Sequence, residues 1–253
     1  MKTVILAGGL GSRLGEYTQS IPKPMVTIGG KPIIWHIMNK YYKHGFNEFY
    51  IALGYKAEVI KDYFLNYKKS KSNIFINLKN HEKIFKDSDI ENWKINLINT
   101  GINTMTGGRL KRLQKYLKDD TFMLTYGDGL SDVDINKLVN FHKSHGKMIT
   151  ITAVRPPARF GELEITASNK VISFVEKPQL DQGWINGGFF LIEPEFLELI
   201  ENDATFLEKE PLEKAALAGE LMAYKHEGFW QCMDTKRDKD LLEKLYVETN
   251  PWG

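Results

Sequence analysis

Short apolar runs rich in β-branched residues alternate with helix-like segments through the first 155 residues of the chain. Apolar side chains recur at the spacing of one helix face in residues 33–44, 57–67, 109–117 and 135–145. The runs between them predict strands at residues 4–7, 49–53, 75–78, 95–98, 122–125 and 149–154. Such alternation is typical of an α/β fold, in which helices cover both faces of a mainly parallel sheet.

The pattern changes after residue 154, where the predicted elements become shorter. Strand patterns follow at residues 163–166, 171–175, 189–192, 221–224 and 229–233, and helical patterns at 207–218 and 239–247. We therefore predict one domain over residues 1–253. It comprises a larger portion at 1–155 and a smaller β/α portion at 156–253 that is continuous with the first sheet.

The composition indicates a globular protein without a large charge of either sign. Hydrophobic residues make up 42% of the 253 residues, and the formal net charge is +2, too small to favour nucleic acid or an anionic membrane as partner. Cys232 is the only cysteine, which excludes an internal disulfide framework and a cysteine-rich zinc site. No apolar run approaches the ~20 residues of a membrane span, and glycines interrupt the N-terminal run, so we expect a soluble cytoplasmic protein.

The first predicted strand runs directly into a loop that suits a bound phosphate. The loop consists of Gly8, Gly9, Leu10, Gly11, Ser12 and Arg13. Glycines let the backbone approach a ligand closely, and successive free N–H groups form a concavity that binds anions. Arg13 and Lys23 add full positive charges, and residues 1–15 contain no acid. The arrangement fits a triphosphate, and the alternative is a glycine-rich turn after an edge strand.

Two common phosphate loops do not match this segment. A Walker loop ends in Gly-Lys-Ser/Thr, whereas Ser12, Arg13 and Leu14 stand here. The dinucleotide fingerprint needs a third glycine where the chain has Leu14. These two classes of phosphate loop are therefore set aside.

Two aspartates follow predicted strands at distant places in the sequence, Asp128 and Asp234. Carboxylates at strand ends suit Mg²⁺, which takes oxygen ligands, bridges substrate phosphates and keeps several waters. A turn-forming aspartate is the alternative for Asp128. Asp132 and Asp134 fit better as caps of the helix predicted to begin at residue 135.

Other segments carry polar groups suited to a substrate. Lys177 follows a predicted strand, where it meets a second phosphate or remains a surface lysine. Asn186 and Gly187 offer an amide and open backbone for polar contacts. Residues 106–109 precede a predicted helix, whose N-terminus favours an anion. The basic run 68–71 is most simply a solvated loop.

Several of these segments together carry a family resemblance. They are residues 6–14, 23–26, 126–129, 176–178, 186–190 and 233–235, and they resemble the sugar-phosphate nucleotidyltransferases. Residues 30–38, 105–112 and 228–231 also resemble the branch of that family that transfers a cytidylyl group to glucose 1-phosphate. Thr27, Asn99 and Cys232 depart from the usual pattern of that branch, and none of them is a proposed metal ligand or phosphate-binding cation.

The resemblance implies a Rossmann-like mixed, mainly parallel sheet and a reaction of CTP with α-D-glucose 1-phosphate that yields CDP-glucose and pyrophosphate. In this reaction the acceptor phosphate makes an in-line attack on the α-phosphorus of CTP, assisted by Mg²⁺. The product feeds deoxysugar synthesis for surface polysaccharide. The resemblance also implies a homo-oligomer. Residues 1–155 become the nucleotide-binding portion, and residues 156–253 the acceptor-binding and oligomerisation portion.

The same resemblance implies a role for each candidate residue. Arg13 and Lys23 are the expected catalytic residues, and Asp128 and Asp234 the expected Mg²⁺ ligands. The expected nucleotide-binding residues are Leu6, Gly8, Gly9, Gly11, Ser12, Arg13, Lys23, Thr106, Gly107, Arg109 and Asp128. The expected acceptor-binding residues are Tyr126, Glu176, Lys177, Asn186 and Gly187.

Two other interpretations stay open on the sequence alone. The same transfer chemistry accommodates UTP or dTTP, or another phosphorylated acceptor, because the family contacts the base partly through backbone groups. A non-catalytic nucleotide-sensing protein with this fold is the second interpretation. Loss of Arg13, Lys23 or one of the aspartates would favour it, and the chain retains all of them.

Overall fold

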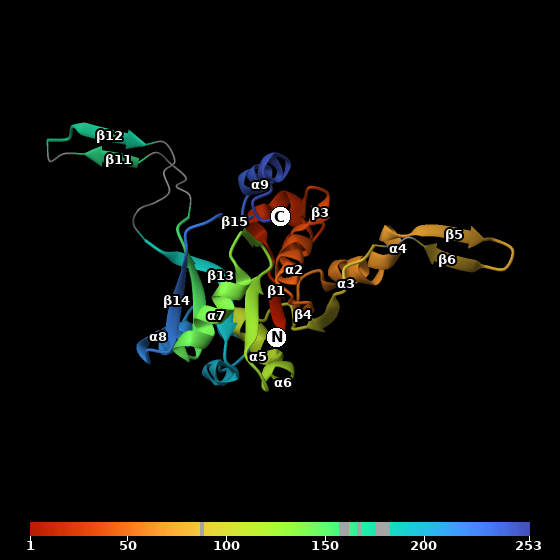
Figure 1. The fold of residues 1–253 in the computed structure, drawn as a ribbon, viewed down its shortest axis with the longest axis horizontal. Helices are drawn as coiled ribbons and strands as arrows, with labels where there is room; N and C mark the ends of the chain where they lie inside the picture. The colour runs from red at the N-terminus through yellow and green to blue at the C-terminus, as the bar shows by residue number, and fades with distance from the viewer. Residues whose placement is uncertain (87–88, 157–161, 166–167, 176–182) are drawn as a thin grey trace.

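A seven-stranded sheet lies at the centre of the computed structural model, which describes residues 1–253 except 87–88, 157–161, 166–167 and 176–182 (Figure 1). Its strands run in the order β14-β10-β13-β8-β1-β4-β7. Their bounds are β1 Thr3–Ala7, β4 Glu48–Leu53, β7 Lys94–Asn99, β8 Phe122–Tyr126, β10 Ile149–Val154, β13 Ile185–Ile192 and β14 Leu221–His226. β13 runs antiparallel to both neighbours and every other pair in this sheet is parallel, which confirms a mixed, mainly parallel sheet.

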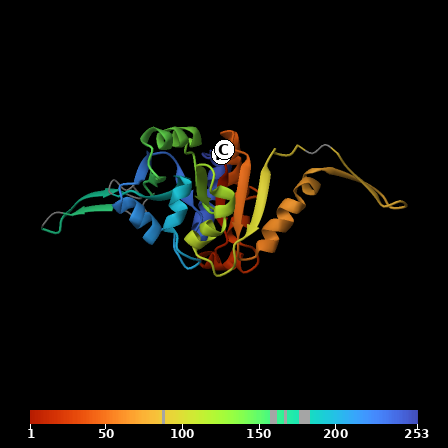
Figure 2. The same cartoon turned by 90° about the horizontal axis from the view of Figure 1, so that it is seen from below.

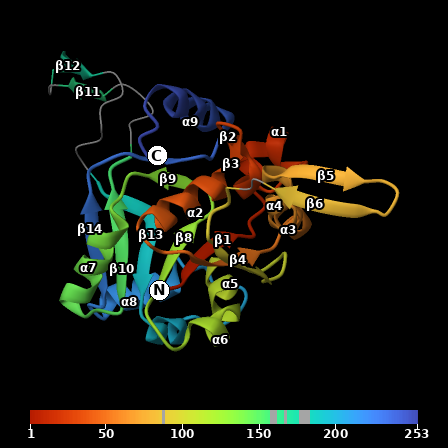
Figure 3. The same ribbon diagram turned by 45° about the vertical axis from the view of Figure 1, so that its right-hand side comes forward.

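Helices cover both faces of this sheet, as the alternation of strands and helices predicted (Figures 2 and 3). In β1, Ile5 and Ala7 belong to one hydrophobic core, and Val4 and Leu6 to the other. The first core includes side chains of α2 Ile33–Lys43, α3 Ala57–Leu65, α7 Ile135–His145 and α9 Lys236–Glu248. The second includes side chains of α5 Thr106–Arg112, α6 Gln114–Leu117 and α8 Glu210–Leu217. Among the described residues, no helix combines the length and apolar character needed to cross a membrane.

Short elements complete the fold. The small helices are α1 Gly15–Thr18 and α4 Tyr67–Lys71, with 3₁₀ helices η1 Ser12–Leu14, η2 Lys23–Met25 and η3 Pro194–Leu199. The two-stranded pairs are β2 Thr27–Ile28 with β3 Lys31–Pro32, β5 Asn73–Asn77 with β6 Glu82–Lys86, β9 Gly129–Ser131 with β15 Trp230–Cys232, and β11 Glu162–Ile165 with β12 Val171–Val175. The β5–β6 and β11–β12 hairpins extend from opposite sides of the central sheet (Figure 2).

Three expectations from the sequence were wrong in detail. The 75–78 run belongs to the β5–β6 hairpin instead of the central sheet, because an apolar pattern does not specify the partner of a strand. The 109–117 helix is divided into α5 and α6, since the N–H of Leu113 bonds only three residues back, to the carbonyl of Leu110. The lysines of the 68–71 run are exposed as expected, but they lie in α4 and not in a loop.

The ends of the later helices follow local chemistry. Asp134 caps α7 by accepting from the N–H of Lys137 at 3.0 Å, as predicted, and Gly146 ends this helix with φ of 62°. Asp132 does not act as a cap and instead pairs with His226 at 2.8 Å. A capping box at Thr235 starts α9 at residue 236, earlier than the apolar pattern predicted.

Candidate active site

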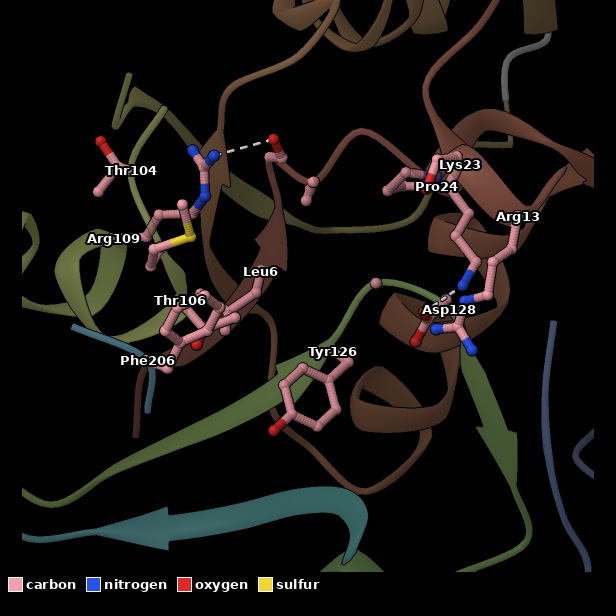
Figure 4. A pocket seen from close by; sticks show the side chains of 17 residues that line it. Leu6, Arg13, Lys23, Pro24, Thr104, Thr106, Arg109, Tyr126, Asp128 and Phe206 are labelled. Atoms are coloured by element: carbon pink, nitrogen blue, oxygen red, sulfur yellow. Dashed lines mark hydrogen bonds and ion pairs between the residues drawn. The ribbon is translucent and has the colours of Figure 1, made fainter. Parts of the chain in front are cut away.

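The site lies where β1 and β8 end side by side in the parallel part of the sheet. Leu6 and Tyr126 are aligned there, and the ends of such strands are the usual position of ligands. A cavity of about 320 Å³ opens at this edge (Figure 4). It is lined by Leu6, Ala7, Gly8, Gly9, Gly11, Ser12, Arg13, Lys23, Pro24, Thr104, Met105, Thr106, Arg109, Tyr126, Gly127, Asp128 and Phe206.

The glycine loop after β1 forms one wall of this cavity with its backbone. Within the described part of the chain, the N–H groups of Gly9, Leu10 and Gly11 donate to no protein acceptor. Gly11 has φ of 64°, and a Cβ atom there would lie 2.9 Å from the Thr18 side chain. The loop thus requires glycine for its shape and leaves several N–H donors for an anion.

Four charged side chains meet at the other wall, of which Arg13, Lys23 and Asp128 line the cavity and Asp234 lies directly behind them. The Lys23 ammonium lies 2.6 Å from a carboxylate oxygen of Asp128 and 2.6 Å from one of Asp234. Arg13, which lies beside Lys23 and Asp128 in Figure 4, reaches the second oxygen of Asp234 at 2.9 Å, and its own side chain is 71% exposed. Two cations and two carboxylates therefore balance each other at the cavity.

Burial and ion pairing have opposite effects on the pKa values of Asp234 and Lys23. Burial by itself raises the pKa of Asp234, but the hydrogen bond and charge of Lys23, with the charge of Arg13, bring that pKa below its ordinary value. Burial lowers the pKa of Lys23, and the two carboxylates outweigh this effect and raise it. Lys23 and Asp234 are consequently both charged at neutral pH.

A short ladder brings Asp234 to Asp128 from the far end of the sequence. β15 pairs antiparallel with β9, which follows Asp128 directly, so that Cys232 aligns with Gly129. The N–H of Met233 then donates to the carbonyl of Asp128 at 2.9 Å. The two predicted metal ligands are thereby fixed on adjacent segments of backbone.

This donor set fits Mg²⁺ in its chemistry. Asp128 and Asp234 offer carboxylate oxygens that already share one cation, the Lys23 ammonium. Magnesium sites in phosphate-transferring enzymes commonly use one or two carboxylates and complete the shell with phosphate oxygens and water. The part of the chain that the structure describes holds no cluster of three or more histidine, cysteine or acidic residues suited to a metal. Phosphate oxygens and water would therefore have to supply the remaining ligands.

Arg109 forms a third part of the cavity wall and is only 4% exposed. Burial lowers the pKa of its guanidinium, and the nearby Arg112 adds to this effect. All of its acceptors are neutral oxygens: the carbonyls of Gly8, Leu53, Gly101 and Ile102 and the hydroxyl of Thr100, at 2.6–3.2 Å. The guanidinium thus joins the loop after β1 to the end of β4 and to the segment that follows β7.

Polar side chains also meet on the side of the cavity that Tyr126 lines. The Tyr126 hydroxyl donates to Glu208 at 2.6 Å and accepts from the amide of Asn186 at 3.1 Å. Thr106 donates to the second oxygen of Glu208, also at 2.6 Å. Burial, with the charge and hydrogen bond of Glu208, raises the pKa of Tyr126, so its hydroxyl remains a donor at neutral pH.

The predicted nucleotide-binding residues all line the cavity except Gly107. This glycine is the second residue of α5 and packs against the 203–207 segment, where a Cβ atom would lie 2.8 Å from the carbonyl of Thr205. The residues 106–109 do not precede the helix, because α5 already begins at Thr106. Helix packing is thus what Gly107 provides in this structure.

The predicted acceptor-binding residues are distributed differently. Tyr126 lines the cavity, and Asn186 is joined to it through the Tyr126 hydroxyl. Gly187 is packed inside the sheet, where a Cβ atom would lie 2.7 Å from the side chain of Val154. Glu176 and Lys177 lie outside the described residues.

Some residues of the site escaped the sequence prediction. Thr104 and Met105 line the cavity directly before the 106–109 segment, so a slightly wider motif includes them. Phe206 also lines it, and Glu208 is bonded to two lining residues. Both lie between η3 and α8. Phe206 precedes the helical pattern predicted at 207–218, and Glu208 falls inside that pattern, although α8 begins only at Glu210.

Comparison with known proteins assigns this arrangement to a family. The model of the family described as nucleotidyl transferase matches residues 2–240. That range includes the glycine loop, Lys23, Asp128 and Asp234.

Two curated relatives are similar to the chain over nearly all of their length. A glucose-1-phosphate cytidylyltransferase from Salmonella typhimurium is 53% identical over 254 residues, which cover 100% of this chain and 98% of that protein. A probable glucose-1-phosphate cytidylyltransferase from Bacillus subtilis is 43% identical over 244 residues, with 96% and 94% covered. The crystal structure of HddC from Yersinia pseudotuberculosis, also solved in complex with GMP-PN, has a TM-score of 0.71 and 27% identity, covering 97% of this chain and 99% of that one.

Proposed function

Because this chain belongs to the nucleotidyl transferase family, we propose that it transfers the cytidylyl group of CTP to α-D-glucose 1-phosphate, forming CDP-glucose and pyrophosphate. The observation that carries this proposal is the 53% identity to a glucose-1-phosphate cytidylyltransferase over the whole chain. The cavity supports it, since free N–H groups, two cations and two carboxylates meet there.

The triphosphate of CTP takes the wall formed by the glycine loop. The unpaired N–H groups of Gly9, Leu10 and Gly11 donate to phosphate oxygens. Arg13, which is largely exposed, leaves Asp234 and holds the β- and γ-phosphates. Lys23 lies deeper and stabilises charge on the α-phosphate, where it increases during transfer.

Asp128 and Asp234 are the residues that would hold Mg²⁺. When bound, the ion supplies positive charge shared between the α-phosphate and the leaving pyrophosphate. In the nucleotide-free chain, the Lys23 ammonium pairs with both carboxylates, and Arg13 supplies the second positive charge. Binding of CTP draws the Lys23 ammonium toward phosphate, which frees these oxygens.

The acceptor enters from the side of Tyr126, where Asn186 contacts sugar hydroxyls, and Glu176 and Lys177 hold the sugar and its phosphate. A phosphate oxygen of glucose 1-phosphate forms a bond to the α-phosphorus of CTP. The bond from the α-phosphorus to the oxygen of the β-phosphate breaks, and pyrophosphate leaves with that electron pair. The nucleophile is already an anion, so the residues act by positioning and charge neutralisation and no general base is needed.

The proposed reaction also assigns roles to the two portions of the domain. Residues 1–155 supply the triphosphate loop, Lys23 and Asp128, and residues 156–253 supply Asp234 and the acceptor contacts. Both substrates are charged metabolites of the cytoplasm, where we expect the enzyme to work. We also expect a homo-oligomer, which light scattering on the purified protein measures directly.

The decisive experiment measures pyrophosphate release across a matrix of nucleoside triphosphates and sugar 1-phosphates. We expect the highest kcat/KM for CTP with glucose 1-phosphate. The 4-amino group of cytosine donates where uracil accepts, so a site built for CTP leaves a polar group unpaired with UTP. Such a mismatch costs ~1–3 kcal/mol, which is a factor of roughly ten to a hundred in kcat/KM.

Each alternative has its own outcome in this matrix. Equal or better use of UTP would refute the cytidylyl assignment and keep the reaction class. Preference for another sugar 1-phosphate would change the acceptor alone. Absence of pyrophosphate release in every combination, with CTP still bound, would favour a nucleotide-sensing protein.

A further inference from the structure

Glu208 connects two side chains that line the cavity from different elements, although it does not line the cavity itself. One of its carboxylate oxygens accepts from the Tyr126 hydroxyl at the end of β8, and the other accepts from the Thr106 hydroxyl at the start of α5. Both distances are 2.6 Å, within the range of charge-assisted hydrogen bonds. A single exposed carboxylate therefore orients two hydroxyl groups.

The hydrogen bonds continue from Tyr126 in a defined direction. A phenol has one proton, and the Tyr126 hydroxyl donates it to Glu208, so its oxygen must accept from the Asn186 amide at 3.1 Å. The carbonyl oxygen of that amide accepts from the N–H of Gly188 at 2.8 Å. Within the described chain, the second N–H of the Asn186 amide has no acceptor. This series of hydrogen bonds from Glu208 through Tyr126 to Asn186, here called the relay, thus leaves Asn186 with an N–H to donate.

The backbone around Glu208 is fixed by close packing against α5. The N–H of Met105 donates to the carbonyl of Asp203 at 2.8 Å, and the N–H of Gly108 donates to that of Thr205 at 3.2 Å. A Cβ atom on Gly108 would lie 2.5 Å from Asp203 backbone atoms, so only glycine permits this approach. Glu208 follows directly on this segment, which limits the movement of its carboxylate.

Thr106 has a second bond that does not depend on Glu208. Its hydroxyl oxygen accepts from the N–H of Leu207 at 2.9 Å. Loss of the Glu208 carboxylate would therefore leave Thr106 held at the start of α5. Tyr126 and Asn186 would lose the acceptor that sets the direction of their hydrogen bonds.

We infer that Glu208 is a positioning residue of the acceptor site: through Tyr126 it orients Asn186 to donate a hydrogen bond to a sugar hydroxyl. This inference rests on the proposed function, in which the acceptor is a sugar 1-phosphate. Glu208 governs selection among sugars and contributes little to the binding of CTP.

The test compares Glu208→Ala and Glu208→Gln with the native enzyme and with Glu213→Ala, which removes an exposed carboxylate from the nearby α8. We expect Glu208→Ala to raise the KM for the sugar 1-phosphate about tenfold, with the KM for CTP changed less than twofold. Glu208→Gln offers one acceptor oxygen in place of two, so its effect is smaller. Glu213→Ala leaves both constants unchanged.

Deoxy analogues of the sugar 1-phosphate distinguish a role of Glu208 in orienting Asn186 from a merely structural role. The native enzyme should discriminate against at least one analogue that lacks a hydroxyl, and Glu208→Ala should reduce that discrimination. The double variant of Glu208→Ala with Tyr126→Phe should be no worse than the more impaired single variant, because both interrupt one relay.

Equal increases in both KM values, or unchanged discrimination among the analogues, would overturn the inference. Additive effects in the double variant would also overturn it. If the native enzyme rejects glucose 1-phosphate, the proposed acceptor fails, and the same comparisons with the sugar 1-phosphate identified by the matrix decide the role of Glu208. Glu208→Gln provides the measurement if Glu208→Ala does not fold.

Discussion

The two ends of the cavity hold their cations in different ways. At the phosphate end, which consists of Arg13, Lys23, Asp128 and Asp234, cations pair with carboxylates, and Arg13 is 71% exposed. At the other end, the Arg109 guanidinium is 4% exposed and donates to neutral oxygens. The first arrangement is exchangeable, because a phosphate can replace each carboxylate and a metal ion can replace the lysine. The second is fixed, because no substrate group can satisfy so many carbonyls from one point.

We infer from this difference that the phosphate end serves the reaction, whereas Arg109 maintains the structure of the cavity. In the proposed reaction, the phosphate end takes up and releases several charges in each turnover, so its ion pairs need only be comparable in strength to those with substrate. Arg109 instead ties the glycine loop, through the carbonyl of Gly8, to the end of β4 and to the segment after β7. We expect substitutions at the phosphate end to alter turnover and those at Arg109 to alter stability.

The largest expected effect is on turnover at the phosphate end. Asp128→Asn and Asp234→Asn should each keep the fold and lower kcat by roughly 10²-fold or more, the scale of a lost electrostatic stabiliser. Circular dichroism checks the fold, and pyrophosphate release under saturating Mg²⁺ checks kcat. Full activity in both variants, or full activity of the native enzyme in excess chelator, would remove these aspartates from the metal site.

Arg109→Met should have the next largest effect, and that effect should be on stability. The methionine fills part of the space but leaves several buried carbonyls without a donor, which costs about 2–3 kcal/mol. For a domain of this size the melting temperature should fall by about 5–10 °C. Arg13→Met serves as the matched control and should melt within about 2 °C of the native protein. Equal melting temperatures for the two variants would contradict the proposed division.

Lys23→Met should strengthen metal binding in the absence of nucleotide, even though it lowers kcat. At pH 7 both partners are charged, since the pKa of Asp234 lies below its ordinary 3.8 and that of Lys23 above its ordinary 10.5. The stabilisation that each gives the other is lost only as the pH falls through the pKa of Asp234 or rises through the pKa of Lys23. Removing the lysine charge should increase Mn²⁺ affinity by about tenfold. Titration of the nucleotide-free protein with Mn²⁺, followed by electron paramagnetic resonance, measures this affinity. Unchanged or weaker Mn²⁺ binding would refute the idea that a metal ion replaces the lysine.

The sequence predicted the phosphate end better than the other end for a physical reason. Gly8 to Arg13 and Asp128 follow strands directly, so recognising the strands already places these residues at one edge of the sheet. Asp234 required one more step, the pairing of β15 with β9, which no spacing in the sequence reveals. Glu208 and Phe206 lie in an irregular connection, and only the packing of the 203–207 segment on α5 brings them to the site.

The same reasoning explains the errors in the fold. The apolar run at 75–78 correctly predicted a strand, but partner choice depends on the β6 residues that follow a turn. The helix expected at 109–117 was interrupted at Leu113, where a tight three-residue hydrogen bond replaces the helical one. Both features depend on backbone contacts that apolar periodicity does not encode. The central strands were predicted because each is an apolar or β-branched run that can be recognised without knowledge of its neighbours, even at the edges of the sheet, where β7 and β14 are only partly buried.

Substitution of Lys177 should have the smallest effect on the kinetics, because this lysine is expected to bind the acceptor and to take no part in holding CTP. Lys177→Met retains much of the apolar stem and removes the charge. We expect the KM for glucose 1-phosphate to rise about fivefold, the scale of ~1 kcal/mol for one charge pair, with kcat and the KM for CTP nearly unchanged. Lys23→Met should show the opposite division, with a lower kcat and little change in the KM for glucose 1-phosphate, since charge at the α-phosphorus matters most in the transition state. A Lys177 variant that bound CTP poorly and glucose 1-phosphate normally would mean that the two substrate positions are reversed, and unchanged kinetics would identify Lys177 as a surface lysine.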